Sequence, residues 1–242
     1  MNTELSVERR AAVHAALGDP ARVAIVDALA AGDAAPGELA GQLGVGSNLL
    51  AHHLKVLEGA GLVRRTRSEG DRRRTYVTLV AEALAGIPVG TPLHAPRILF
   101  VCSRNSARSQ IAAALWCRRS TIPVASAGTR PAREVHPAAL AAIRRHGLSL
   151  PAARTHHVAE VTGRDDLVIA VCDQAHEEMG ELRRLHWSIP DPVRAGTDQA
   201  FDDAFGRLSR RISRLAAILT AATTSTPILE ESGEVDDAEP VR

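Results

Sequence analysis

Cys102 and Arg108, separated by five residues, are the side chains whose types and spacing most clearly suggest chemistry. Their loop follows the apolar run ILFVC and leads into an apolar-periodic segment, which predicts a strand, a tight loop and a helix over 109–117. Backbone N–H groups of a tight loop at a helix N-terminus bind tetrahedral oxyanions. The same field favours a cysteine thiolate, and a planar guanidinium can hold two oxygens at once. The pattern therefore predicts a nucleophilic thiolate beneath a bound oxyanion.

The remaining residues of this loop are expected to form or support the oxyanion site. Asn105 can hold the loop through hydrogen bonds from its side chain to the backbone, and the hydroxyl of Ser109 can donate to the thiolate. The residues predicted to surround the oxyanion are Ser103, Arg104, Asn105, Ser106, Ala107 and Ser109. The alternative is that Cys102 is an inert buried thiol. It is disfavoured by the strand before the loop, the helix after it and the polar sequence NSARS.

An attack by a thiolate on phosphorus or arsenic also requires an acid for the leaving oxygen. Asp191 lies between two prolines in HWSIPDPVRAG, a segment that can fold over the oxyanion. We therefore expect Asp191 to be the general acid; the alternative is an Asp-Pro turn without a chemical role. Cys172 ends another apolar run, DLVIAVC.

Apolar runs of strand length alternate with helical segments from Arg97 onward. This alternation predicts an α/β domain over 97–222, with a doubly wound, four-stranded parallel sheet and helices on both faces. Functional side chains of such sheets gather at the carboxyl ends of the strands, where Cys102 and Cys172 both lie.

The first 80 residues instead predict short helices followed by a hairpin. Asp19 and Pro20 mark one helix start, and a second helix runs from Pro36 to Gly44. Ser47 is expected to cap a third helix, after which two strands flank the turn SEGD. This order is typical of an α+β winged helix-turn-helix.

The third helix and the basic hairpin are the predicted DNA contacts. Polar side chains of the helix should face the major groove, and arginines of the hairpin suit phosphate contacts. The predicted DNA-binding residues are Ser47, Asn48, His52, Lys55, Arg72, Arg73 and Arg74. A basic hairpin by itself is more often only a solvated surface.

The remaining predictions rest on the composition of individual segments. Residues 81–96, broken by three prolines, predict a flexible linker that lets the two domains act independently, and the acidic residues 223–242 predict a disordered tail. No apolar run approaches the length of a membrane span and no signal peptide is evident, so a cytoplasmic protein is expected. Residues 1–96 contain no cysteine, and their histidines form no spaced cluster, so no metal site is expected.

Residues 10–80 resemble the ArsR-type family of winged-helix repressors. The resemblance rests on LGDPARVAIVDAL, GELAGQLGV and HHLKVLEGAGLVRRTRSEGDRRRTYVTL. It implies a homodimer, formed through this domain, that binds a palindromic operator.

Residues 97–220 resemble the low-molecular-weight phosphatase superfamily, specifically its arsenate reductase branch. The matching motifs are FVCSRNSARSQ, SAGTRPA and AVCDQAHEEM with LHWSIPDPVRAGTDQAFDDAFGRL. The resemblance implies that Cys102 is the nucleophile, Arg108 binds the oxyanion and Asp191 is the general acid. Gln110 stands where the tyrosine phosphatases usually have proline, and no aromatic residue follows Asp191-Pro192, which favours the reductase branch.

The sequence does not decide which thiol supplies the electrons that reduce arsenate. In thioredoxin-coupled relatives a cysteine at the position of Cys172 attacks the nucleophile, and a third cysteine relays the disulfide, but here that position is Met179. An external thiol or redoxin could attack directly, or a Cys102–Cys172 disulfide could be reduced without a relay. Thioredoxin or a mycothiol/mycoredoxin-type reductant is the expected partner, and no bound cofactor is expected. Cys117 is expected to pack as a small apolar residue.

The expected function is a bifunctional transcriptional regulator and thiol-dependent arsenate reductase of arsenic resistance, with DNA and arsenate or phosphate as ligands. One alternative is a transcription factor whose second domain is a catalytically silent oxyanion or redox sensor. Another is a low-molecular-weight protein tyrosine phosphatase fused to a DNA-binding domain.

Overall fold

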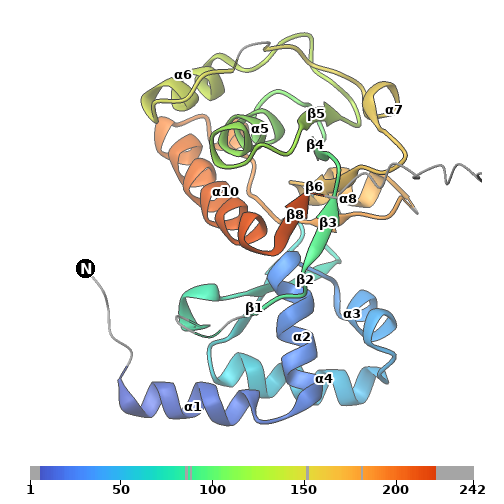
Figure 1. The fold of residues 1–242 in the computed structure, drawn as a ribbon, viewed down its shortest axis with the longest axis vertical. Coiled ribbons are helices and arrows are strands. Elements are labelled where there is room, and N and C mark those ends of the chain that lie inside the picture. Colours follow the sequence, from blue (N-terminus) through green and yellow to red (C-terminus); the bar gives the residue numbers. More distant parts are fainter. Residues whose placement is uncertain (1–5, 85–86, 88, 151–152, 181, 222–242) are drawn as a thin grey trace, which may run out of the picture.

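The computed structural model describes residues 6–84, 87, 89–150, 153–180 and 182–221, and these form two domains stacked on one another (Figure 1). The N-terminal domain consists of four helices and a hairpin. Its elements are α1 (Val7–Leu17), α2 (Pro20–Ala31), α3 (Pro36–Leu43), α4 (Ser47–Gly59), β1 (Val63–Arg67) and β2 (Thr75–Leu79). The strands β1 and β2 pair in antiparallel fashion. The predicted winged helix-turn-helix is confirmed.

Local sequence accounts for most of these boundaries. The carboxylate of Asp19 accepts hydrogen bonds from the backbone N–H groups of Ala21 and Arg22 at the start of α2. Gly44 ends α3 in the left-handed conformation, with φ of 64°. The prediction that Ser47 caps α4 is wrong, because Gly46 is the N-cap and Ser47 is already helical.

The C-terminal domain is an α/β unit. Its elements are β4 (Ile98–Cys102), α5 (Arg108–Arg119), β5 (Val124–Gly128), α6 (Pro137–Arg145), α7 (Val158–Val161), β6 (Leu167–Ala170), α8 (Asp173–Glu178), β7 (Leu185–His186), α9 (Pro192–Ala195) and α10 (Asp198–Ile218). The strands form one parallel sheet in the order β5-β4-β6-β7. Figure 1 shows α5, α6 and α10 on one side of this sheet and α7 and α8 on the other. The predicted four-stranded, doubly wound sheet is confirmed.

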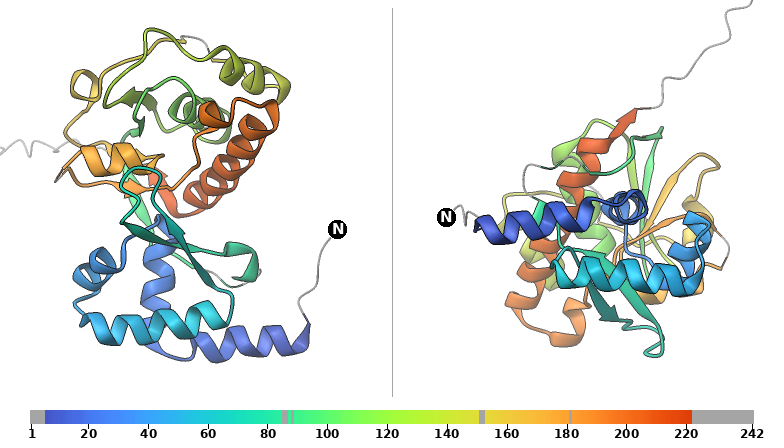
Figure 2. Two further views of the ribbon diagram at one scale, coloured as in Figure 1. Left: turned by 180° about the vertical axis from the view of Figure 1, so that it is seen from behind. Right: turned by 90° about the horizontal axis from the view of Figure 1, so that it is seen from below.

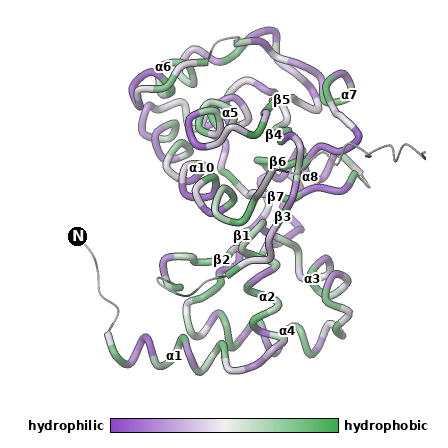
Figure 3. The backbone as a smooth tube through the Cα atoms, viewed as in Figure 1, coloured by the Kyte–Doolittle hydropathy of each residue, from purple (hydrophilic) through white to green (hydrophobic). Residues whose placement is uncertain are grey.

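The core of this domain explains why β4 is a continuous apolar run. All five residues of β4 are buried, because helices cover both faces of the sheet. Phe100 on β4 packs against the rings of Trp116 and Trp187. In Figure 3, α10 alternates between hydrophilic and hydrophobic positions, as expected of a helix with one buried face.

The segment expected to be a flexible linker contains two short elements. A 3₁₀ helix, η1, covers Ala81–Leu84, and β3 (Leu93–Ala95) pairs in parallel with β8 (Leu219–Ala221) after α10. The predicted tail, 223–242, lies outside the described residues.

The two domains are joined by buried polar contacts, whereas the sequence predicts independent units. Arg211 of α10 contacts both carboxylate oxygens of Asp33 at 2.6 Å, and the Ser188 N–H donates to the same carboxylate at 2.7 Å. The indole N–H of Trp187 donates to the carbonyl of Ala31 at 2.9 Å. Gly32 lies so close to His186 that a Cβ would sit 2.9 Å from the His186 carbonyl oxygen. The domains therefore share one polar interface.

Asp33→Ala should destabilise the protein by about 3–5 kcal/mol, because it leaves the Arg211 guanidinium buried without its counter-ion. Urea denaturation followed by tryptophan fluorescence checks this, because Trp187 lies at the same interface. Asp165→Ala, at an exposed position, should change the free energy of unfolding by less than about 0.5 kcal/mol. Equal effects of the two substitutions would contradict the assigned role of the Asp33–Arg211 pair.

Candidate active site

A cavity of about 250 Å³ opens where β4 ends and α5 begins, at the carboxyl edge of the sheet. The predicted loop and Asp191 both contribute to its lining. The residues that line it are Cys102, Arg104, Ser106, Ala107, Arg108, Ala132, Glu134, His136, Pro137, Asp191 and Val193. Cys102 and Arg108 are only 2% and 5% exposed.

The carbonyl groups of the loop are fastened to the chain segment that follows β5. Thr129, Arg130, Ala132 and His136 donate from their N–H groups to the carbonyls of Cys102, Ser103, Arg104 and Ser106, in that order. Within the part of the chain that the structure describes, the N–H groups of residues 104–108 donate to no protein acceptor. These amides are therefore available to a tetrahedral oxyanion. Gly128 permits the close approach, because a Cβ there would lie 2.9 Å from the N atom of Asn105.

Asn105 holds the loop in a conformation that non-glycine residues seldom adopt, with φ of 47°. Its side-chain oxygen accepts from the His156 N–H at 2.8 Å, which fixes the orientation of the amide. Its Nδ2 therefore donates to the hydroxyls of Ser109, at 2.9 Å, and Ser126, at 3.1 Å.

This arrangement also directs the proton of Ser109. The Ser109 oxygen accepts from Asn105, and the Cys102 sulfur lies 3.1 Å away, so the hydroxyl can donate to that sulfur. A hydroxyl donor stabilises the charged form of a thiol. The Ser109 hydroxyl is therefore directed at the sulfur atom predicted to be the nucleophile.

Arg108 is held in place by one carbonyl and two carboxylates. It donates to the Ile189 carbonyl at 3.0 Å and contacts Asp191 at 3.1 Å. Glu69, from the hairpin of the N-terminal domain, lies 3.9 Å from the same guanidinium. Burial by itself would lower the pKa of Arg108, but the two nearby cysteines and Asp191 raise it above its ordinary value. The guanidinium therefore stays charged in the cavity.

Asp191 is the N-cap of α9, where one of its oxygens accepts from the Val193 N–H at 3.1 Å. Its other oxygen faces Arg108, so the carboxylate lies on the same side of the cavity as the predicted oxyanion ligand. A general acid must be within hydrogen-bond reach of the leaving oxygen, which this position allows.

The three cysteines occupy different environments. Cys172 is buried at the start of α8, and its sulfur accepts from the Ala175 N–H at 3.4 Å. Burial raises the pKa of the Cys172 thiol, and the positive charge of Arg108 offsets this only in part. Cys172 follows Val171, whose N–H donates to the carbonyl of Val101 at 2.7 Å, so the two buried cysteines end neighbouring chain segments. Cys117 is exposed on α5, so the prediction that it packs as an apolar residue is wrong.

The hairpin tip, residues 68–71 after β1, contacts residues of this cavity. The sequence did not predict this contact. Figure 2 shows the tip turned toward the C-terminal domain beside α8. The Glu69 N–H donates to Asp173 at 2.7 Å, and the Glu69 side chain accepts from the Asp191 N–H at 2.9 Å. The Ser68 hydroxyl and the Asp71 N–H both donate to Glu177 at 2.7 Å. In the sequence, Glu69 and Asp71 belong only to the turn SEGD expected between the two strands.

The predicted DNA-binding residues lie in two places, four on α4 and three directly after the hairpin tip. Ser47, Asn48, His52 and Lys55 are exposed on α4, which Figure 1 places at the far end of the molecule from the C-terminal domain. Residues 72–74 are exposed arginines that follow the hairpin tip.

No group of three or more histidine, cysteine, aspartate or glutamate side chains among the described residues is placed to hold a metal ion. No described helix is long and apolar enough to cross a membrane.

Comparison with known proteins shows which protein family the chain belongs to. The model of the family "Low molecular weight phosphotyrosine protein phosphatase" matches residues 97–225, more than half of the sequence. The chain belongs to this family. A helix-turn-helix domain model matches residues 17–66 of the same chain. No curated protein matches the sequence.

Solved structures similar to this member of the phosphatase family have several activities. An arsenate reductase from Archaeoglobus fulgidus DSM 4304 is 25% identical over 50% of this chain and 98% of its own, with a TM-score of 0.45. The tyrosine phosphatase Wzb from Escherichia coli K30, in complex with sulphate, is 23% identical over 51% and 97%, with a TM-score of 0.46. The YwlE arginine phosphatase from Geobacillus stearothermophilus is 25% identical over 50% and 90%, with a TM-score of 0.42. The two family models show that this chain joins a helix-turn-helix domain to a domain of the phosphatase family.

Proposed function

We propose that this protein is a DNA-binding regulator and a thiol-dependent arsenate reductase. The observation that carries the proposal is one cavity that holds Cys102, Arg108 and Asp191, with the buried thiol of Cys172 on the neighbouring chain segment, where the Val171 N–H donates to the Val101 carbonyl at 2.7 Å. A hydrolytic phosphatase needs no second thiol at this place. Among the described residues that line the cavity there is no phenylalanine, tyrosine or tryptophan to stack on a phenol ring.

The first chemical step forms a bond between sulfur and arsenic. Loop amides and Arg108 hold the arsenate oxygens, and the Cys102 thiolate attacks arsenic. An As–O bond breaks, Asp191 protonates the departing oxygen, and the oxygen leaves as water. The arsenic remains As(V) at this stage.

The second step transfers two electrons. A second thiol loses its proton and attacks the sulfur of Cys102. A disulfide forms, the electron pair of the S–As bond stays with arsenic, and arsenic departs as arsenite. We assign this attack to Cys172 or to an external thiol. Met179 ends α8 at the position of the relay cysteine, so an external thiol or a redoxin of the thioredoxin or mycoredoxin type must complete the cycle.

The N-terminal domain supplies the regulatory activity. Ser47, Asn48, His52 and Lys55 present polar groups on the exposed face of α4, and the arginines of residues 72–74 supply phosphate contacts. We propose that two chains pair through this domain and bind an operator, with an affinity that falls as salt rises.

The reductase activity is tested by incubating the purified full chain with arsenate and a thiol, with or without a redoxin. Arsenite should appear, and mass spectrometry of protein stopped in mid-reaction should find a Cys102–Cys172 disulfide. Rapid hydrolysis of p-nitrophenyl phosphate, with arsenate acting only as an inhibitor, would instead assign the domain to the phosphatases.

The contact between Glu69 and the cavity favours a second function, an oxyanion sensor. Glu69 lies 3.9 Å from Arg108 and accepts from the N–H of Asp191, so a bound oxyanion would compete with this carboxylate for the same partners. Binding of the oxyanion would weaken the docking of the hairpin tip and so release the hairpin for DNA. Coupling of this kind is typically worth about 1–3 kcal/mol.

Glu69→Gln should uncouple DNA affinity from the oxyanion, because a neutral amide cannot replace the charge that competes for Arg108. In gel shifts with DNA from upstream of the gene itself, arsenate should change the affinity of the unaltered protein by roughly 5- to 150-fold. The variant should bind tightly with or without arsenate, while Asp203→Asn, an exposed control on α10, should respond like the unaltered chain. An undiminished arsenate response in Glu69→Gln would exclude this coupling.

A further inference from the structure

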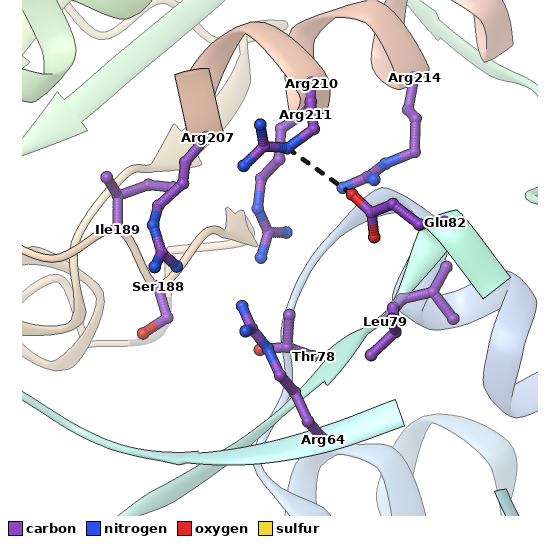
Figure 4. A pocket seen from close by; sticks show the side chains of 11 residues that line it. Arg64, Thr78, Leu79, Glu82, Ser188, Ile189, Arg207, Arg210, Arg211 and Arg214 are labelled. Atoms are coloured by element: carbon purple, nitrogen blue, oxygen red, sulfur yellow. Dashed lines mark ion pairs between the residues drawn. The ribbon is translucent and has the colours of Figure 1, made fainter. Parts of the chain in front are cut away.

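A second polar cavity, of about 170 Å³, lies between the two domains and shares no lining residue with the cavity at Cys102. Five arginine side chains line it (Figure 4). Helix α10 contributes the side chains of Arg207, Arg210, Arg211 and Arg214, and β1 contributes Arg64 from the opposite side. The cavity is therefore built by both domains.

The arrangement follows from the spacing along α10. Positions 207, 210, 211 and 214 are related by steps of three and four residues, which puts them on one face of a helix. Like charges at this spacing destabilise a helix unless another group compensates them. The compensation must therefore come from outside α10.

The described carboxylates compensate only part of this charge. Glu82 lies 3.7 Å from Arg210, and Asp33 is fully engaged by Arg211 at 2.6 Å. Within the described ranges, Arg64, Arg207 and Arg214 form no ion pair. The cavity thus carries three guanidinium charges in excess.

Arg214 shows the consequence most clearly. Its Nε is buried and donates to no acceptor among the described residues. Burial lowers the pKa of Arg214, and the positive charge of Arg211 lowers it further. A buried donor without an acceptor destabilises the folded protein. An anion in the cavity would accept its hydrogen bond and so remove this cost.

The lining also indicates which anion fits. Guanidinium groups match the oxygens of phosphate-type anions through paired hydrogen bonds, and the hydroxyl of Thr78 adds a neutral donor. No cysteine or histidine is among the lining residues, so the site is suited to binding and not to transfer chemistry.

We propose that this cavity is a second oxyanion site, which binds inorganic phosphate or the phosphoryl group of a small phosphorylated molecule. Because its ligands come from β1, β2 and α10, the bound anion links the two domains and stabilises their docked arrangement. The position between the domains favours a small anion over the backbone of DNA, whose predicted contacts on α4 lie at the far end of the molecule. The proposal is independent of the reaction at Cys102.

Calorimetric titration of the full chain with inorganic phosphate, at low ionic strength, tests the proposal. Two sites per chain are expected. Arg108→Ala should leave one site, and the double variant Arg207→Gln/Arg214→Gln should leave the other, with affinity at the altered site reduced by about tenfold or more. Arg118→Gln, an exposed position on α5 outside both cavities, should keep both sites.

Thermal unfolding separates loss of binding from loss of folding. Without phosphate, the double glutamine variant should have a Tm equal to or above that of the unaltered chain, because repulsion is removed. Phosphate should raise the Tm of Arg108→Ala but have no effect once all three arginines are replaced. Tighter binding of AMP than of phosphate would identify a phosphorylated molecule as the ligand, and equal binding would identify the free oxyanion.

Two results would overturn the proposal. One is a single phosphate site that disappears in Arg108→Ala. The other is a double glutamine variant that still binds two phosphates. If the double variant instead loses affinity for a DNA duplex while the unaltered chain binds only one phosphate, the arginines serve the DNA backbone.

Discussion

Cys102→Ser is expected to lower the rate of arsenite formation by about four orders of magnitude or more, to the background of the assay. A serine hydroxyl at this place is a far weaker nucleophile than the thiolate that Ser109 and the loop amides support. Even an arsenate ester on serine could not proceed, because a second thiol cannot form a disulfide with oxygen. Both chemical steps depend on the sulfur atom.

The control for this prediction is Cys117→Ser. Cys117 is exposed on α5 and lines neither cavity, so its replacement should leave arsenite formation within about twofold of the unaltered rate. The assay is arsenite production under a fixed concentration of thiol and redoxin. Equal rates in the two variants would remove Cys102 from the mechanism, whatever the fold of the domain.

Arg108→Lys is expected to reduce kcat/KM for arsenate by roughly 10²–10³-fold. Lysine keeps the positive charge but cannot hold two oxygens in the plane of a fork. It also loses the geometry that lets Arg108 contact Asp191 at 3.1 Å while it donates to the Ile189 carbonyl at 3.0 Å. We expect kcat to fall as well as KM to rise, because the contact strengthens as charge develops on the oxygens.

Arg104→Lys is the matched control, since Arg104 lines the same cavity but is exposed. Its effect on kcat/KM should stay below about tenfold, as for a single exposed charge. Steady-state kinetics of both variants checks the comparison. A larger loss in Arg104→Lys than in Arg108→Lys would transfer the main oxyanion contact to residue 104.

Local sequence patterns were sufficient to predict the architecture of each domain. The continuous apolar run of β4 predicts a strand buried on both faces, and the motif from Cys102 to Arg108 predicts a loop that enters a helix. The Asp19 cap and the Gly44 terminus were also predictable from local chemistry. The error at Ser47 is of the same local kind, because Gly46 takes the capping position one residue earlier.

Relations between distant segments were not predictable in this way. Cys117 was expected to be buried, yet it is exposed on α5. The rotation of α5 about its axis, set by its packing against α10 and β5, decides which side of the helix is buried. Glu69 was expected only to be part of the turn SEGD, and its contact with Asp191 joins residues that no local pattern relates.

By itself the sequence determined the chemistry that each segment can perform: a loop that stabilises a thiolate and an oxyanion, and a helix-turn-helix with a basic hairpin. Only the tertiary structure decided that the hairpin tip contacts the arginine of that loop and that α10 and β1 enclose a cavity in which three of five guanidinium groups form no ion pair with a described residue. The physical reason is that strands, caps and tight loops depend on the residues within a few positions. Docking between domains depends on charges and shapes brought together by the whole fold.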